Sequence, residues 1–478
     1  MGPETMNKQI RNVFWLVVVL LALLLVYTVR WTVVDARSLN QNALNRIPAQ
    51  KSQKLPRGEI YTASGRTIAR SVKRGRDGTY VRRYPMGSLM AHPVGYSYAV
   101  RGQSGLEKYY NDRLTGEYQN VQSVLDQLLG RGGEEQSMVT NLDRGGQQTA
   151  TNQLAGQAGA IVVIEPRTGR VPVYVSSPSY NPSAMNDDDG AAALFRDRGS
   201  PLLDRVSGAT YAPGSTFKVV TATAALDSGE FTPDSTVDGS SPQKFSGQPL
   251  ANFGGAQFGQ VTLETALQNS VNTAFGNIGV QLGEDTLIEY MKRYGFYALP
   301  PIDLPDGQLS SSGLRDREGN LLPDDSGADL ARLAIGQERL AVTPLQMATV
   351  AATVANGGVR MEPRIARLFR DEYGRVRGRI DPERATRVMK PETARELNAM
   401  MRKVVEQGTG QAANIGGLDM AGKTGTAEVP GGNQAWFIGF APYDRPRYAI
   451  AVTVEKTTST GGALAAPIAA SVLQELLR

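Results

Sequence analysis

Residues 211–218 read YAPGSTFK, and the assignment of the fold starts from this short stretch. Pro213 and Gly214 end one element of structure, and the apolar pattern after them predicts a helix that begins at or near Ser215. Ser215 and Lys218 are three residues apart, so on that helix the lysine amine lies one turn from the serine hydroxyl. The hydroxyl also lies at the positive end of the helix, where developing negative charge is stabilised. The stretch therefore predicts a nucleophilic serine with a lysine beside it.

The composition indicates that lysine, rather than histidine, is the base for this serine. The chain of 478 residues contains one histidine, His92, and no cysteine. Disulfides, thiol nucleophiles and cysteine zinc sites are therefore excluded. A Ser-His-Asp triad could use only His92, and a histidine metal site usually needs two or more histidines. An ordinary lysine is protonated at neutral pH, but burial or a neighbouring cation lowers its pKa until the neutral amine can accept a proton.

The spacing of Ser215 and Lys218 is weak support alone, because Ser241 and Lys244 repeat it. A proline lies between the latter two, and the sequence around them predicts a loop that would not align the pair. Ser215 is distinguished by further motifs downstream. One of them is Ser270-Val271-Asn272, which lies between two helix-like stretches.

The other motif is AGKTGTA at residues 421–427, which occurs once. Its glycines allow a ligand to approach the backbone closely, and its lysine and two threonines can hold a carboxylate. The stretch from Gly417 to Thr424 also matches the phosphate loop GxxxxGK[ST]. Neither a strand before Gly417 nor a helix after Thr424 is predicted, so the nucleotide-binding alternative is disfavoured.

An apolar segment at residues 13–29, VFWLVVVLLALLLVYTV, predicts one transmembrane helix. At a rise of 1.5 Å per residue it spans roughly 26 Å, close to the thickness of a hydrocarbon core. Lys8 and Arg11 precede it, so residues 1–12 are expected to be a cytoplasmic tail and the rest of the chain to lie outside the cytoplasm. The alternative is a cleaved signal peptide, but Val29-Arg30-Trp31 is a poor cleavage site.

Downstream, strand-like and helix-like segments predict an α+β or α/β sheet domain over residues 156–478. A hairpin is expected at 159–175, strands at 436–440 and 448–454, and a closing helix at 463–477. Residues 30–155, rich in Gly and Arg and with short strand-like pieces, form a separate N-terminal domain in this scheme.

The charge pattern does not favour a nucleic-acid or metal site. The net charge is +5, which is small for this length and fits an anionic surface without indicating nucleic acid. Residues 176–200 are expected to be a loop. The acidic run Asp187–Asp189 within it is better explained by solvation than by metal binding.

The order Ser-x-x-Lys, Ser-x-Asn, Lys-Thr-Gly is the signature of penicillin-binding proteins and class A β-lactamases. YAPGSTFK, GKTGTAE, WFIGFAP and residues 335–358 resemble the transpeptidase domain of class B penicillin-binding proteins, most of all the actinobacterial PbpA-type branch. Residues 57–69, 83–87 and 105–116 resemble that family's N-terminal pedestal. The resemblance implies a transpeptidase fold in which helices sandwich a β-sheet, with a β-rich pedestal (dimerisation-like) domain at 30–155.

The same resemblance implies acyl transfer on peptidoglycan stem peptides, with β-lactams as mimics of D-Ala-D-Ala and without a metal or organic cofactor. Ser215 is then the nucleophile, Lys218 its base, and Ser270 with Lys423 a proton relay to the leaving amine. Lys423 would also lower the pKa of Lys218 by repulsion. The implied substrate-binding residues are Asn272, Thr424, Gly425 and Thr426, and the implied oxyanion hole consists of the backbone N–H groups of Ser215 and Thr426.

Two departures from the family pattern lie outside the three motifs. Thr62-Ala63 replace the Asp-Arg usual in the pedestal, and Asp204 occurs where members often have asparagine. His92 is expected to be structural. The alternatives are a β-lactamase, a β-lactam sensor and a scaffold of the division or elongation machinery. A membrane glycosyltransferase of the SEDS class is an expected partner, while elongation and septation both stay open.

Overall fold

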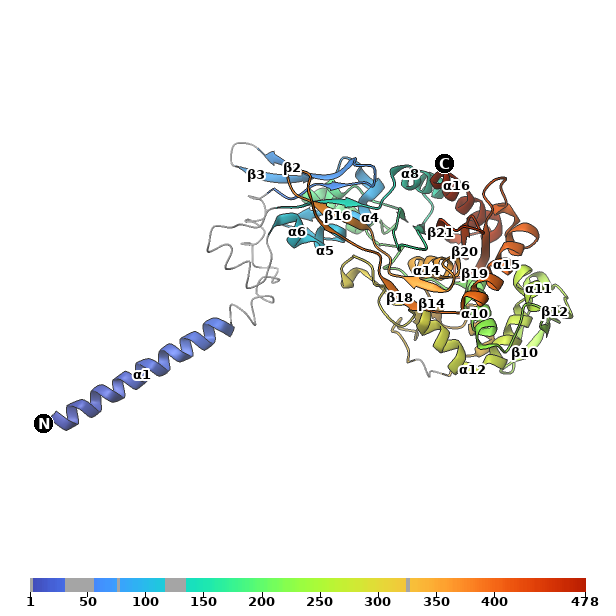
Figure 1. Ribbon diagram of the computed structural model, residues 1–478, viewed down its shortest axis with the longest axis horizontal. Coiled ribbons are helices and arrows are strands. Elements are labelled where there is room, and N and C mark those ends of the chain that lie inside the picture. The colour runs from blue at the N-terminus through green and yellow to red at the C-terminus, as the bar shows by residue number, and fades with distance from the viewer. Residues whose placement is uncertain (1–2, 31–55, 75–77, 117–134, 324–326) are drawn as a thin grey trace. The chain divides into compact units, whose positions relative to one another are not determined.

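The computed structural model describes residues 3–30, 56–74, 78–116, 135–323 and 327–478 (Figure 1). The chain divides into two units, Met1–Pro56 with Lys73–Val81, and Arg57–Val72 with Arg82–Arg478. The first unit contains α1 (Pro3–Val29), and its segment Ile10–Thr28 is long and apolar enough to cross a membrane. The predicted segment 13–29 lies almost entirely within this stretch. Residues 31–55 and 117–134 of the predicted pedestal lie outside the described residues.

The second unit is built on an antiparallel five-stranded sheet with the order β19-β20-β21-β7-β8. The strands are β7 (Gly159–Ile164), β8 (Val173–Ser177), β19 (Ala421–Val429), β20 (Gly432–Ala441) and β21 (Tyr448–Thr457). β7 and β8 form the hairpin expected at 159–175, and β20 and β21 contain the two strands expected near the C-terminus. The motif AGKTGTA lies on β19, an edge strand, which rules out the phosphate-loop conformation.

Both faces of this sheet are covered by helices. Ile161 and Val163 of β7 belong to one apolar cluster with α8 (Arg144–Leu154) and α16 (Ala466–Leu477). Ala160 and Val162 point the other way, into the larger cluster that holds α10 (Lys218–Ser228), α12 (Asn272–Tyr294) and α14 (Pro344–Ala355). Figure 1 shows α8 beside α16, and α14 beside the sheet. A strand buried on both faces reads as a continuous apolar run, as GAIVVI does. The predicted sheet sandwiched by helices is confirmed.

A second, six-stranded sheet has the order β17-β16-β6-β1-β2-β3. Its N-terminal strands are β1 (Ile60–Tyr61), β2 (Thr67–Arg74), β3 (Thr79–Arg83) and β6 (Ser137–Thr140). β16 (Ala366–Arg370) and β17 (Val376–Arg379) come from much later in the chain, and β16 pairs antiparallel with β6. No sequence pattern predicted that residues 366–379 join the strands of the N-terminal region.

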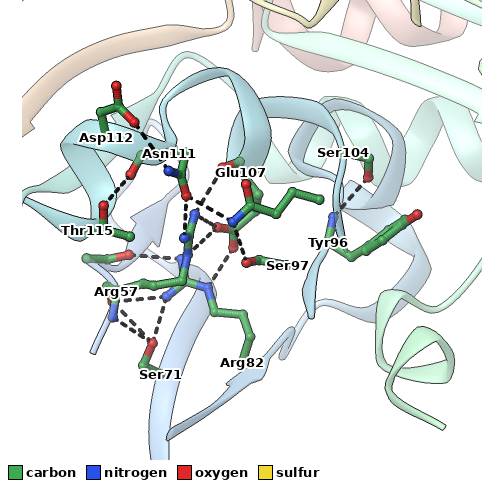
Figure 2. A network of polar contacts seen from close by, with 12 residues as sticks. Arg57, Ser71, Arg82, Tyr96, Ser97, Ser104, Glu107, Asn111, Asp112 and Thr115 are labelled. Carbon is green, nitrogen blue, oxygen red and sulfur yellow. Dashed lines mark hydrogen bonds and ion pairs between the residues drawn. The ribbon is translucent and has the colours of Figure 1, made fainter. Parts of the chain in front are cut away.

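Beside this sheet, a buried carboxylate binds two arginines (Figure 2). Glu107 of α5 (Gly105–Tyr109) is fully buried, and its Oε2 accepts hydrogen bonds from Arg57 Nε and Nη2 at 3.1 and 3.0 Å. Its Oε1 accepts from Arg82 Nε at 2.6 Å and from the Tyr84 hydroxyl at 3.3 Å. Burial alone would raise the pKa of Glu107, but the charges of Arg82 and Arg57 lower it below the ordinary value. The cluster therefore remains ionised inside the protein.

The remaining helices and strands connect these parts. In the N-terminal region they are η2 (Gly87–Met90), α4 (Ala91–Val94), β4 (Ser97–Tyr98), β5 (Gly102–Gln103) and α6 (Asn111–Thr115). In the middle of the chain they are η3 (Pro182–Asn186), α9 (Asp188–Arg196), η4 (Gly214–Phe217), β9 (Thr236–Asp238), β10 (Gln243–Phe245), β11 (Gln248–Leu250), η5 (Phe253–Gly255), β12 (Gln260–Thr262) and α11 (Leu263–Gln268). Later come η6 (Asp306–Gln308), β13 (Gly313–Leu314), α13 (Leu330–Ala334), β14 (Leu340–Ala341), β15 (Val359–Met361), β18 (Arg384–Arg387), α15 (Pro391–Gln407), η7 (Gln411–Ala413) and η8 (Gly461–Ala465).

Two local predictions were wrong. Residues 176–200 are not simply a loop, because α9 begins within the acidic run and the Asp187 side chain accepts a hydrogen bond from Gly190 N. Asp188 and Asp189 lie in its first turn, where carboxylates interact favourably with the helix dipole. Lys244 is on strand β10 rather than in a loop, and Ser241 Oγ accepts a hydrogen bond from Asn252 N.

Candidate active site

One cavity of about 320 Å³ brings the three motifs together. Ser215, Ser270 and Asn272 line it from one side, and Thr424–Thr426 line it from β19. The amines of Lys218 and Lys423 are buried behind this lining. All eight residues singled out in the sequence therefore belong to one site.

The turn at Ser215 is held by contacts on both sides. Ser215 lies in the 3₁₀ turn η4, directly before α10, as the Pro-Gly pair predicted. Gly214 has a φ of 52°, and a Cβ there would lie 2.9 Å from the Thr426 carbonyl oxygen. A Cβ at Gly425 would lie 2.8 Å from the Pro213 carbonyl oxygen. The two glycines thus allow the serine turn and β19 to pack backbone against backbone.

Lys218 is fully buried, and its amine points to the Ser270-x-Asn272 turn. Nζ donates hydrogen bonds to Ser270 O at 2.8 Å, to Asn272 Oδ1 at 2.7 Å and to Ser270 Oγ at 3.2 Å. Burial, followed by the charge of Lys423, lowers the pKa of Lys218 well below its ordinary value. In its neutral form the amine has two N–H groups, enough for the two carbonyl oxygens, and a lone pair that can accept a hydroxyl proton. The Ser270 hydroxyl would then be the donor in its 3.2 Å contact with Nζ. Among the described residues, no hydrogen bond joins it to Ser215.

The backbone around Ser270 turns sharply to present both motif side chains. Ser270 has a φ of 58°, the left-handed region that non-glycine residues rarely adopt, and its N–H bonds to Leu267 O at 3.2 Å. α11 ends just before this turn, and α12 begins at Asn272. Such a conformation persists where the surrounding structure fixes it, which is frequent at functional sites.

Lys423 is the second buried amine of the site. It is fully buried on β19, where burial lowers its pKa to about 7, and Nζ donates to Thr424 O at 3.0 Å. Its neighbour on the strand, Thr424, shares a hydroxyl–hydroxyl hydrogen bond of 2.6 Å with Thr409. Thr426 Oγ1 accepts from Gly461 N at 3.1 Å. β19 is an edge strand, so no strand of the described residues pairs with one side of its backbone, and a ligand can bind along that side.

Sequence reasoning missed several residues of the cavity wall. Thr409, Phe253 and Phe258 line it, although none belongs to a stretch singled out in the sequence. Gln337 also lines it, and it lies within residues 335–358, which were recognised without a role for this side chain. Thr409 lies near the end of α15, and only the fold brings it next to Thr424. In the described part of the chain, no group of three or more His, Asp and Glu side chains is arranged to hold a metal ion.

His92 and the two departures from the family pattern lie outside the cavity. His92 is half-buried, with its ring centroid 5.4 Å from that of Tyr180, and the burial of its imidazole lowers its pKa. Thr62 Oγ1 accepts from Arg66 N at 3.1 Å and closes a turn between β1 and β2. Asp204 accepts a hydrogen bond of 2.6 Å from the Tyr174 hydroxyl. These contacts are those expected of structural residues.

Comparisons with known proteins identify the family. A family model described as the penicillin binding protein transpeptidase domain matches residues 159–474, and one described as the penicillin binding protein A dimerisation domain matches residues 57–137. The peptidoglycan D,D-transpeptidase PbpA of Mycolicibacterium smegmatis is 34% identical, with 99% of each chain covered, and that of Mycobacterium tuberculosis is 33% identical with the same coverage.

Solved structures give the same assignment. The D,D-transpeptidase domain of a peptidoglycan glycosyltransferase from Eggerthella lenta has a TM-score of 0.77 at 34% identity, covering 89% of this chain and 98% of that one. Penicillin-binding protein A from M. tuberculosis, as an imipenem acyl-enzyme complex, has a TM-score of 0.78 at 31% identity, covering 89% and 100%. The resemblance inferred from the motifs is confirmed: this chain belongs to the penicillin-binding protein transpeptidase family, with PbpA-type D,D-transpeptidases among its relatives.

Proposed function

We propose that this protein is a membrane-anchored D,D-transpeptidase that cross-links peptidoglycan stem peptides through an acyl-enzyme on Ser215. The observation that carries the proposal is the buried Lys218 amine, whose pKa is lowered and which lies against the Ser270–Asn272 turn behind the cavity that Ser215 lines. A neutral lysine at this place is the base that a serine nucleophile needs when histidine is absent.

Acylation begins when Lys218 takes the Ser215 proton and Oγ attacks the carbonyl carbon between the two terminal D-alanines. The new Oγ–C bond forms, the C–N bond breaks, and Ser270 with Lys423 passes a proton to the departing D-alanine amine. The N–H groups of Ser215 and Thr426 stabilise the oxyanion. Asn272 binds the donor's amide, while Thr424, Gly425 and Thr426 bind its terminal carboxylate. The amine of a second stem peptide then attacks the acyl carbon, frees Ser215 and completes the cross-link.

The proposed organisation follows the sequence analysis. Residues 1–12 are a cytoplasmic tail, 13–29 an anchor, 30–155 a pedestal and 156–478 the catalytic domain, which lies outside the cytoplasm. The apolar helix Ile10–Thr28 and the basic Lys8 and Arg11 support the anchor and its direction. A SEDS-class glycosyltransferase is the proposed membrane partner, in the division or elongation machinery. Failure of the two proteins to co-purify in mild detergent would count against this partnership.

Labelling with a fluorescent penicillin tests the nucleophile. The full-length protein is expected to gain one covalent label on the Ser215 peptide, and Ser215→Ala is expected to gain none. Ser241→Ala is the matched control, because Ser241 shares the Ser-x-x-Lys spacing but does not itself line the cavity, and this variant is expected to keep the label on Ser215. A label that persists in Ser215→Ala would refute the assignment.

The lifetime of the same label separates a transpeptidase from a β-lactamase. A transpeptidase keeps its β-lactam acyl group, because it has no need for rapid hydrolysis. Intact mass spectrometry over time is therefore expected to show an adduct that persists for much longer than seconds. Loss of the adduct within seconds, with steady turnover of penicillin, would favour the β-lactamase alternative.

A further inference from the structure

An exposed aromatic side chain lies at the wall of the catalytic cavity. Phe253, between β11 and β12, is 78% exposed although it lines the same cavity as Ser215. An apolar ring gains free energy when another apolar group covers it and displaces water. Because Phe253 and Ser215 line one cavity, a ligand bound there can cover the ring.

Hydrogen bonds fix the start of the segment 252–255, which carries this ring. Asn252, directly before Phe253, is buried, and its N–H donates to Ser241 Oγ at 2.9 Å. Its side-chain amide donates to Gly239 O at 2.9 Å and accepts from Thr273 N at 3.0 Å. These bonds hold the start of the segment against α12.

The tip of the segment has room to adjust. Gly254 and Gly255 follow the ring with φ values of 63° and 73°, and a Cβ built on either would have no atom within 4 Å. Glycine changes backbone conformation at little steric cost. The ring is therefore held next to the cavity, while the backbone after it can adapt to what the cavity contains.

The direction of the segment identifies which part of a substrate the ring would meet. Asn272 Nδ2 donates to Ala251 O at 2.9 Å, which joins the segment to the residue proposed to bind the donor's amide. The threonines proposed to bind the terminal carboxylate lie on another strand, β19. The residues that line the cavity carry no charged side chain, so an aliphatic surface fits beside Phe253 better than an ionic group.

We propose that Phe253 is a specificity-determining residue, which covers the aliphatic part of the stem-peptide residue that precedes the two terminal D-alanines. This inference rests on the proposed function of the cavity. In this proposal Phe253 contacts a side chain of the acyl donor that lies away from the reacting carbonyl. Binding energy from such a remote group positions the donor for attack.

Two β-lactams with the same ring system provide the test. Penicillin G carries an acyl side chain where the donor's preceding residue would lie, and 6-aminopenicillanic acid lacks it. In the full-length protein, Phe253→Ala is expected to slow acylation by penicillin G about tenfold and acylation by 6-aminopenicillanic acid less than about twofold. Phe253→Leu, which keeps an apolar side chain, is expected to recover most of the rate with penicillin G.

Phe195→Ala is the matched control. Phe195 is 66% exposed on α9 and does not line this cavity, so its removal is expected to leave both rates unchanged. Equal slowing with both compounds in Phe253→Ala, or no slowing with either, would overturn the proposal. Failure of the proposed function gives a different result, because Ser215 of the unmodified protein would then be acylated by neither compound.

Discussion

Two buried charged clusters in this protein differ in how their charges are balanced. Beside the six-stranded sheet, the carboxylate of Glu107 lies between the guanidinium groups of Arg57 and Arg82. In the catalytic cavity, Lys218 and Lys423 donate only to neutral oxygens, and neither forms an ion pair with a described residue. Both clusters are buried, yet only the first consists of opposite charges.

Paired and unpaired buried charges have different physical consequences. Opposite charges that pair inside a protein keep each other ionised, and removal of one leaves the rest unpaired at a high cost. Burial instead lowers the pKa values of the two lysines, which have no carboxylate partner, and the charge of Lys423 lowers that of Lys218 further. The first cluster stabilises the fold, and in the second the lowered pKa values favour the neutral amine that the proposed base requires.

The largest expected effect follows from removal of the base. Lys218→Met retains an unbranched side chain of similar length but no amine, so acylation of Ser215 by penicillin G is expected to slow by about 10³-fold. Stopped-flow mixing followed by mass spectrometry measures the rate, and far-ultraviolet circular dichroism verifies that the variant folds. A folded variant with a rate near that of the unmodified protein would show that another group acts as the base.

The second-largest expected effect follows from breaking the ion-pair cluster of Glu107, Arg57 and Arg82. Glu107→Gln leaves Arg57 and Arg82 buried without a counter-charge, so the free energy of unfolding is expected to fall by about 3–5 kcal/mol. Denaturant titration of the full-length protein measures it. Glu392→Gln is the matched control, since Glu392 pairs with Arg395 on the surface and its loss is expected to change the free energy by less than about 1 kcal/mol. Equal effects of the two substitutions would contradict the comparison.

Removal of one of the two buried lysines, Lys218 and Lys423, is expected to have the opposite effect on the free energy of unfolding. Lys423→Met removes a buried amine that has no opposite charge, so the free energy of unfolding near pH 7 is expected to rise by about 1–3 kcal/mol. The folded-state pKa of Lys423, about 7, is below the ordinary 10.5, so the unfolded chain binds more protons between these pH values. The unmodified protein therefore gains stability as the pH rises through this range, and the advantage of the variant shrinks. A variant less stable than the unmodified protein at pH 7 would count against this explanation.

The smallest expected effect is a shift in pH dependence. The acylation rate rises with pH as Lys218 loses its proton, and the charge of Lys423 lowers the pKa at which this happens. Lys423→Met is expected to reduce the rate and to move the rising limb of its pH profile to higher pH by about one unit. An unchanged or lower midpoint would show that the two amines do not interact in this way.

The residues that gather at this cavity could be picked out from the sequence because the motifs are local. Ser215 and Lys218 lie within one helical turn, Ser270 and Asn272 within one bend, and the lysine and threonines of β19 within one strand. Each motif needs only short-range structure to present its side chains. The sheet domain could be predicted from apolar runs such as GAIVVI, which are long enough to be recognised as buried strands.

Features that depend on distant contacts were not predicted. β16 joins the strands of the N-terminal region across more than two hundred residues, and no local pattern specifies its pairing with β6. Thr409 meets Thr424 only through the packing of α15 on β19. The acidic run at 187–189 was mistaken for part of a loop because carboxylates at a helix start resemble solvated ones in sequence.

Direct titration of the Lys218 amine tests the central claim, that burial beside a second lysine produces a neutral base. In protein labelled with ¹³C-lysine, the Cε resonance that disappears in Lys218→Arg identifies this residue, and its chemical shift can be followed against pH. The like-charged cluster predicts a titration midpoint well below 10.5, which moves to higher pH in Lys423→Met. A midpoint near 10.5 in the unmodified protein would contradict the account.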